Sequence, residues 1–160
     1  MNEKEFIAGI DRRFPYEDES AAIALVDEAS RISPNACFMI GEELSRPPRS
    51  AAPGVDSRLR VLAHLRKAFD HPLRNHVLDV VELRVRGGGL SVSDAVATLG
   101  EVGAFPGQYC AMNIVYFACD ADGSAELEDE YDQILQRWMS NREDPLQVSG
   151  DIVNTPRSEK

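Results

Sequence analysis

Long hydrophobic runs are missing from this sequence. No apolar stretch among its 160 residues approaches the roughly 18 residues that a membrane-spanning helix needs. Residues 1–5 (MNEKE) also lack the basic region and the long apolar segment of a secretory signal. We therefore expect a soluble, cytoplasmic protein with no membrane partner.

Cysteine and histidine are scarce, with three residues of each type. Cys37, Cys110 and Cys119 lie in apolar segments and form no CxxC pattern, so we expect small buried side chains rather than disulfides or a zinc site. The histidines all fall within residues 64–76, without an HExxH string or an obvious nucleophile, and we expect them at helix ends or on the surface. The sequence therefore predicts no catalytic residue, no metal and no cofactor.

Two other segments resemble ligand-binding loops only superficially. Residues 120–131 place oxygen-bearing side chains at alternate positions, as a calcium-binding EF-hand does. However, Ala125 stands where that loop needs glycine, and Tyr131 stands where it needs a bidentate glutamate. The three glycines at 87–89 are not followed by the Lys-Ser/Thr of a phosphate-binding loop, so they predict the end of a helix. We therefore predict a protein that is not an enzyme.

Positive charge is in short supply overall but concentrated in the middle of the chain. The formal net charge is −10, yet residues 46–90 hold nine basic and four acidic residues between two acidic flanks. Few aromatic residues interleave with these arginines, which makes nucleic acid an unlikely partner. The basic segment is either a binding surface or charge balance within the fold. The candidate partner-binding residues are Arg58, Arg60, Arg66, Lys67 and Arg74.

Three prolines organise the apolar pattern. Pro34, Pro72 and Pro106 each follow a stretch of helical period and each precede an apolar segment. Since proline is well tolerated at the first position of a helix, this placement predicts helix, tight turn, helix, three times over. We predict an all-α fold of about seven to eight helices in one domain over residues 1–140. The predicted helix pairs span about 20–45, 55–86 and 91–119, with a capping helix at 125–140, a proline-rich linker at 45–54 and a flexible tail at 141–160.

The second helices of the last two pairs share one apolar template. Counted from Pro106, the apolar positions are Ala111, Ile114, Val115 and Phe117, and the same offsets from Pro72 are also apolar. We expect these residues to line the inner face of the helix. Phe117 is therefore predicted to point inward.

This spacing resembles the HEAT and armadillo class of α-helical repeats. The resemblance covers residues 21–138 and concerns architecture: a period of 34 to 38 residues, antiparallel pairs and a proline near each turn. It implies a stack of helix pairs with a concave surface for another macromolecule. The alternative is an irregular helical bundle, which obeys the same packing rules.

Recognition of another protein is the function that these exclusions favour. A small, acidic, helical protein fits a dedicated binder or inhibitor, for example an immunity-type protein of bacteria that masks a basic toxin surface. The alternative function is to grip a phosphate backbone with basic residues of the segment 46–86. A third hypothesis is a homo-oligomer, such as a homodimer, that buries Trp138 and Tyr131 between copies.

Overall fold

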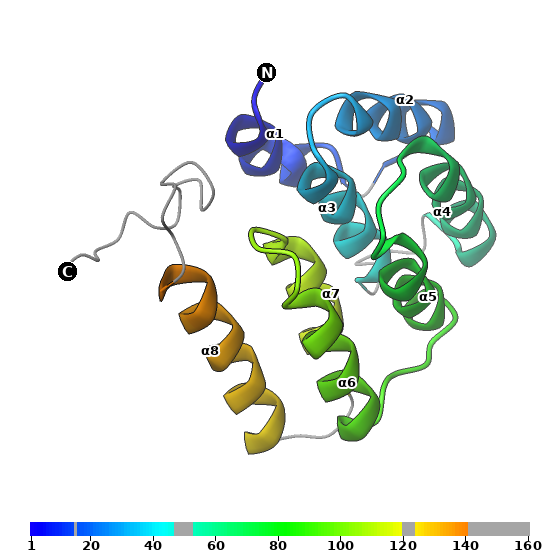
Figure 1. The fold of residues 1–160 in the computed structure, drawn as a ribbon. Coiled ribbons are helices and arrows are strands. Elements are labelled where there is room, and N and C mark those ends of the chain that lie inside the picture. The colour runs from blue at the N-terminus through cyan, green and yellow to red at the C-terminus, as the bar shows by residue number, and fades with distance from the viewer. Residues whose placement is uncertain (15, 47–52, 120–123, 141–160) are drawn as a thin grey trace.

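The computed structural model describes residues 1–14, 16–46, 53–119 and 124–140. Within these ranges the chain forms eight α-helices, one short 3-10 helix and no strand, which confirms the predicted all-α class (Figure 1). Most of the predicted linker, the start of the calcium-like segment at 120–123 and the predicted tail lie outside the described residues. The elements are α1 (Glu3–Gly9), η1 (Ile10–Arg12), α2 (Glu19–Ser30), α3 (Pro34–Ser45), α4 (Val55–Ala68), α5 (Arg74–Val85), α6 (Val92–Val102), α7 (Tyr109–Ala118) and α8 (Ala125–Ser140).

The three prolines occupy two different kinds of position. Pro34 is the first residue of α3, and the Ser33 hydroxyl caps the helix by accepting a backbone hydrogen bond at 3.0 Å. Pro72 and Pro106 instead lie in the turns, because α5 begins two residues after Pro72 and α7 three residues after Pro106. Gly107 has a φ of +89°, a left-handed conformation that α7 can follow but not include. The prediction of a proline at the first helical position is therefore confirmed for Pro34 and wrong for Pro72 and Pro106.

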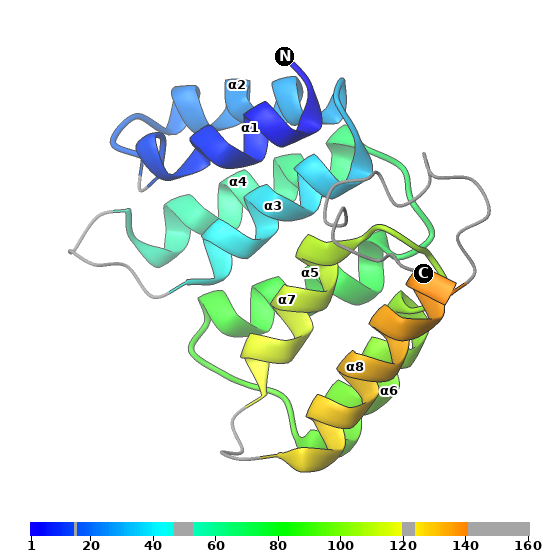
Figure 2. The same cartoon turned by 90° about the vertical axis from the view of Figure 1, so that its left-hand side faces the viewer.

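Helices α3, α5 and α7 form the centre of the molecule. Each of the three contacts the other two, α2 packs on α3 and α4, and α8 packs mainly on α6. Figure 2 shows α1 and α2 at one end of the molecule and α6 and α8 at the other. In a linear stack of pairs α5 would separate α3 from α7, whereas here α3 contacts α7 directly. The irregular bundle, the second of the two arrangements considered above, describes this packing.

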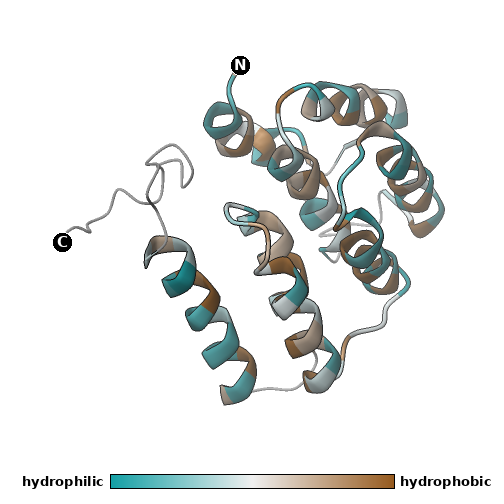
Figure 3. Ribbon diagram, viewed as in Figure 1, coloured by the Kyte–Doolittle hydropathy of each residue, from teal (hydrophilic) through white to brown (hydrophobic). Residues whose placement is uncertain are grey.

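The central helices lie close together where a glycine faces a neighbouring helix, and the residues between them are fully buried. Nine of the twelve residues of α3 are buried, including Phe38 and Ile40, and Met112 of α7 is also fully buried. A Cβ atom on Gly41 of α3 would lie 3.3 Å from a methyl group of Val81 in α5, so only glycine allows this spacing without a shift. The brown, hydrophobic sides of these helices face one another in Figure 3.

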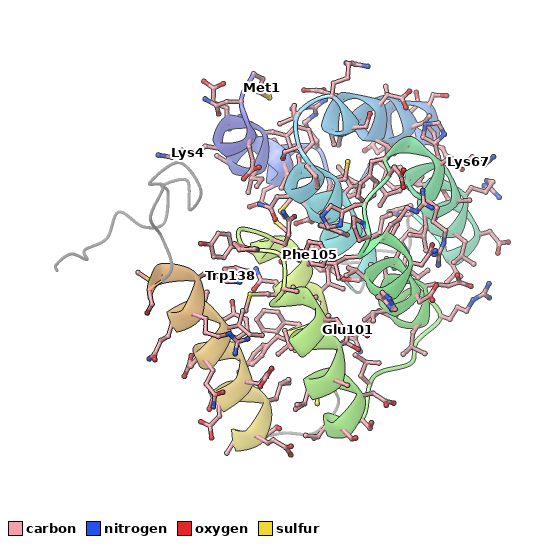
Figure 4. All side chains as sticks on the ribbon, in the orientation of Figure 1. Met1, Lys4, Lys67, Glu101, Phe105 and Trp138 are labelled. Carbon is pink, nitrogen blue, oxygen red and sulfur yellow. The ribbon has the colours of Figure 1, made fainter. Side chains whose placement is uncertain are left out.

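Helix α8 is held by Trp138, a residue that is only 4% exposed. Its indole N–H donates a 3.0 Å hydrogen bond to the backbone oxygen of Gly103, and its ring meets Tyr109 edge to face at 5.1 Å. Figure 4 shows Trp138 between α8 and the neighbouring helices. The chain itself thus covers Trp138, so this residue does not provide the contact between copies that the homo-oligomer hypothesis gave it.

Candidate partner-binding surface

Arg58, the first candidate partner-binding residue, belongs to α4 and is buried against the C-terminal end of α3. Only 6% of the residue is exposed, and its guanidinium donates to the backbone oxygens of Leu44 at 3.0 Å and Arg46 at 3.4 Å. The last carbonyl groups of a helix lack partners within the helix, so Arg58 satisfies groups that would otherwise be unpaired. The structure therefore uses this arginine inside the fold.

Arg74 has a similar structural role between α4 and α5. One of its terminal nitrogens donates to the backbone oxygens of both Arg66 and Phe69 at 3.0 Å, which joins the start of α5 to the end of α4. Arg66 lies in the same region and binds the carboxylates of Asp79 at 2.9 Å and Glu82 at 3.2 Å. Both side chains are less than one third exposed, so they offer little surface to a partner.

Arg60 and Lys67 are the candidates that face water. Arg60 holds the carboxylate of Glu19 in α2 through two nitrogens, each 2.9 Å from an oxygen. The hydrogen bond from Arg60 keeps the pKa of Glu19 below its usual range, with a further contribution from Ser57. Lys67 points outward from α4 (Figure 4) and forms no ion pair with a described residue. Of the five predicted residues, only Lys67 is thus exposed and unpaired within the described ranges.

The three histidines contact different groups, two of them carboxylates and one of them aromatic rings. His64 lies 2.8 Å from a carboxylate oxygen of Asp27, and His76 lies 3.5 Å from that of Glu101. His71 packs its ring against Phe38 and Phe105, and this burial lowers its pKa. No cluster of three or more histidine, cysteine or acidic residues that could hold a metal occurs among the described residues.

The cysteines lie mainly in the core. Burial raises the pKa of Cys37 to about 12 and also raises the pKa of Cys110, so both thiols stay protonated at neutral pH. The Cys110 thiol lies 3.7 Å from the sulfur of Met39. Cys119 is half-buried. The two buried cysteines thus behave as small apolar residues, as the sequence predicts.

Helix α8 carries a set of acidic residues that form no ion pair within the described ranges. Its inner face is apolar and includes the buried residues Leu127, Ile134 and Trp138. Its other faces are largely hydrophilic in Figure 3. Four exposed carboxylates and one half-buried carboxylate, that of Glu130, extend from this helix, and none forms an ion pair with a residue that the structure describes. We call this set the α8 acidic surface: Glu126, Glu128, Asp129, Glu130 and Asp132.

Next to the α8 acidic surface lies a chain of aromatic rings that the sequence interpretation missed. Phe117 is 66% exposed, so the prediction that it points inward is wrong. The buried face of α7 continues from Ile114 to Ala118, four residues later, and does not include Phe117. The Phe117 ring meets Tyr116 edge to face at 5.2 Å, and Tyr116 meets Tyr131 of α8 at the same distance. Offsets counted from a proline could not show this, because they do not fix where the neighbouring helices end.

Tyr116 connects these rings to the carboxylates. Its hydroxyl donates to a Glu128 oxygen at 3.5 Å, and its pKa is raised by partial desolvation and by the negative charges of Glu128 and Asp132. Tyr131 donates to the side-chain oxygen of Asn113 at 3.1 Å, which fixes the position of its ring. Phe117, Tyr116 and Tyr131 thus form a supported row of rings with acidic neighbours, which we call the aromatic row.

Phe117 also lines a hollow of about 370 Å³. Burial raises the pKa of Glu42 in its wall, while the Arg46 guanidinium at 3.1 Å acts in the opposite direction. The Ser45 hydroxyl donates to the backbone oxygen of Glu42 at 2.8 Å, and no histidine lies among the described lining residues to activate it. The lining therefore combines both charges without a nucleophile–base pair; it consists of Glu42, Ser45, Arg46, Arg84, Asn113, Ile114 and Phe117.

Comparison with known proteins gives no family. No protein-family model matches the chain, and neither the curated proteins nor the solved structures contain a match. None of the helices in the described ranges has the length and apolar character to span a membrane.

Proposed function

We propose that this protein is a non-catalytic binding domain that recognises a basic surface of another protein through the α8 acidic surface. The observation that carries the proposal is the different use of charge in the two parts of the molecule. The arginines of α4 and α5 bond to carbonyls and carboxylates of the chain itself. The carboxylates of α8 form no ion pair with a described residue, although Glu128 accepts a 3.5 Å hydrogen bond from Tyr116, and their charge remains available to another molecule.

Two physical features support α8 as a binding element. Its apolar face is docked through Trp138, so the helix backbone that carries the carboxylates is already ordered and loses little freedom on binding. A cluster of one charge also raises the rate of encounter with a partner of opposite charge. The net charge of −10 acts in the same direction over the whole chain.

An inhibitor or immunity-type protein is the specific form that we favour. Such a protein masks a basic surface by charge complementarity, and it needs an ordered acidic surface rather than a reaction centre. The proposal includes the cytoplasmic location predicted from the sequence, a compartment that suits three free cysteines. Binding to nucleic acid through residues 46–86 has less support, because Arg58, Arg66 and Arg74 are engaged within the fold.

The experiment is affinity capture from the organism's own lysate with three forms of the protein. The first is the natural chain, and the second carries Glu126→Gln, Asp129→Asn and Asp132→Asn on α8. The third is a matched control, Asp11→Asn, Glu17→Gln and Asp56→Asn, which neutralises three exposed carboxylates elsewhere. We expect the same protein with the first and third forms and at least a tenfold loss with the second.

Salt dependence and a fourth form separate this proposal from its alternative. Binding through the α8 acidic surface should weaken as salt rises, because exposed charges are screened within about 10 Å at 0.1 M salt. A form with Arg60→Gln and Lys67→Gln should retain the captured protein. The alternative function would be supported if the natural chain captured nucleic acid, the form with Arg60→Gln and Lys67→Gln lost it, and the α8 form retained it.

A further inference from the structure

We propose that the aromatic row is an arginine-binding surface, on which a guanidinium of the partner stacks against Phe117 while the neighbouring carboxylates of α8 balance its charge. This inference rests on the proposed function and specifies the chemistry of the partner: arginine rather than lysine. Phe117 is 66% exposed near the end of α7, and Tyr116 links it to α8 by contacting both its ring and that of Tyr131 and by donating to Glu128. The two elements together form a docking surface with a defined charge.

The geometry of the aromatic row favours a ring that is held in place. Phe117 contacts Tyr116 edge to face, with an interplanar angle of 86°, and Tyr116 contacts Tyr131 in turn. Tyr131 is fixed by its hydrogen bond to Asn113. Since an edge-to-face contact occupies the rim of one ring and a single face of the other, it leaves at least one face of Phe117 for another group.

Charge complementarity decides which group that is. Tyr116 donates to Glu128 and is close enough to Asp132 for that charge to act on its hydroxyl. A cation bound at Tyr116 would therefore have two carboxylates near it. A planar guanidinium can stack on a ring and still donate hydrogen bonds at its edge, whereas an ammonium is a compact, strongly hydrated charge. Phe117 also borders the hollow that Arg46 and Arg84 line, and their positive charges disfavour a cation there. We therefore place the guanidinium on the part of the aromatic row near Tyr116 and Glu128.

The test measures binding of labelled hexa-arginine and hexa-lysine peptides by fluorescence anisotropy. The natural chain should bind hexa-arginine about two- to fivefold more tightly than hexa-lysine, the range expected for an exposed cation–π contact. Phe117→Leu keeps an apolar side chain but removes the ring, and should bring this ratio close to one while hexa-lysine affinity is unchanged. The control Val55→Ala changes another exposed apolar residue, on α4, and should keep the ratio.

The outcomes separate this inference from the proposed function. A ratio that Phe117→Leu leaves unchanged would overturn the arginine-binding surface, even if the α8 variant loses both peptides as the proposed function requires. If the α8 variant binds both peptides like the natural chain, the proposed function itself fails. A natural chain that is dimeric by light scattering, with Phe117→Leu monomeric, would also overturn the inference, because a second copy would then cover the ring. Circular dichroism checks that each variant is folded.

Discussion

The α4–α5 region and helix α8 carry opposite charges, and the fold treats these charges differently. In α4 and α5, arginines satisfy helix-end carbonyls, as Arg58 does, or bind acidic residues of the chain, as Arg66 does. In α8, all five carboxylates extend from an ordered helix without an ion pair to a described residue. The comparison teaches that a dense charge in the sequence does not by itself indicate a binding surface. What matters is how much of that charge the fold leaves unpaired.

Loss of the anchor of α8 should have the largest effect, because the α8 acidic surface exists only while the helix is docked. Trp138→Ala removes a buried aromatic side chain and its hydrogen bond to Gly103. We expect the free energy of unfolding to fall by about 3–5 kcal/mol. Urea denaturation followed by circular dichroism measures it. The control Met139→Ala changes the exposed neighbour in the same helix, and an equal loss there would show that Trp138 is not the anchor.

Arg58 and Arg60, two residues apart on α4, provide the next test. Arg58→Ala leaves the carbonyls at the end of α3 without their donor. We expect a loss of about 2–3 kcal/mol in the free energy of unfolding, as for a buried hydrogen bond from a charged group. Arg60→Ala breaks an exposed ion pair and should shift the urea midpoint far less. Equal shifts would mean that Arg58 does not support the fold as its contacts indicate.

Replacing an aspartate by asparagine should change the free energy of unfolding in opposite directions in the two regions. Asp132→Asn removes repulsion from Glu128 and Asp129, which lie four and three residues earlier on α8, and should stabilise the protein by about 0.2–0.5 kcal/mol. Asp79→Asn removes the 2.9 Å ion pair with Arg66 and should destabilise it by up to about 0.5 kcal/mol. Thermal unfolding at low and high salt measures both effects, and salt should reduce both. The same sign for the two changes would contradict the comparison.

The smallest effect concerns the protonation of Glu19. Its pKa in the folded protein is lowered by the hydrogen bond from Arg60. The resulting stabilisation is therefore complete above the pKa of the unfolded chain and is lost as the pH falls through the folded pKa. Carboxyl chemical shifts measured by NMR should place the Glu19 midpoint below that of an ordinary glutamate. In Arg60→Ala this midpoint should rise, and an unchanged midpoint would show that the ion pair does not form in solution.

Local signals predicted the helices well because they depend on neighbours in the chain. Ser33 before Pro34 and Ser91 before α6 both cap helices as their side chains suggest. The end of α5 before the glycines at 87–89 follows the same logic, since Gly87 has a φ of +94°. The candidate site was predicted less well. Whether Arg58 is buried depends on Leu44, fourteen residues earlier and in another helix.

By itself, the sequence determined that this chain is helical, where most helices begin and end, and that its charges are divided between a basic middle and acidic flanks. Only the tertiary structure decided that α3 contacts α7, that the arginines of the middle are used internally, and that Phe117 stays exposed beside α8. The physical reason is the range of the interactions. Periodicity and capping act over a few residues, whereas burial and ion pairing depend on which distant helix covers a given face.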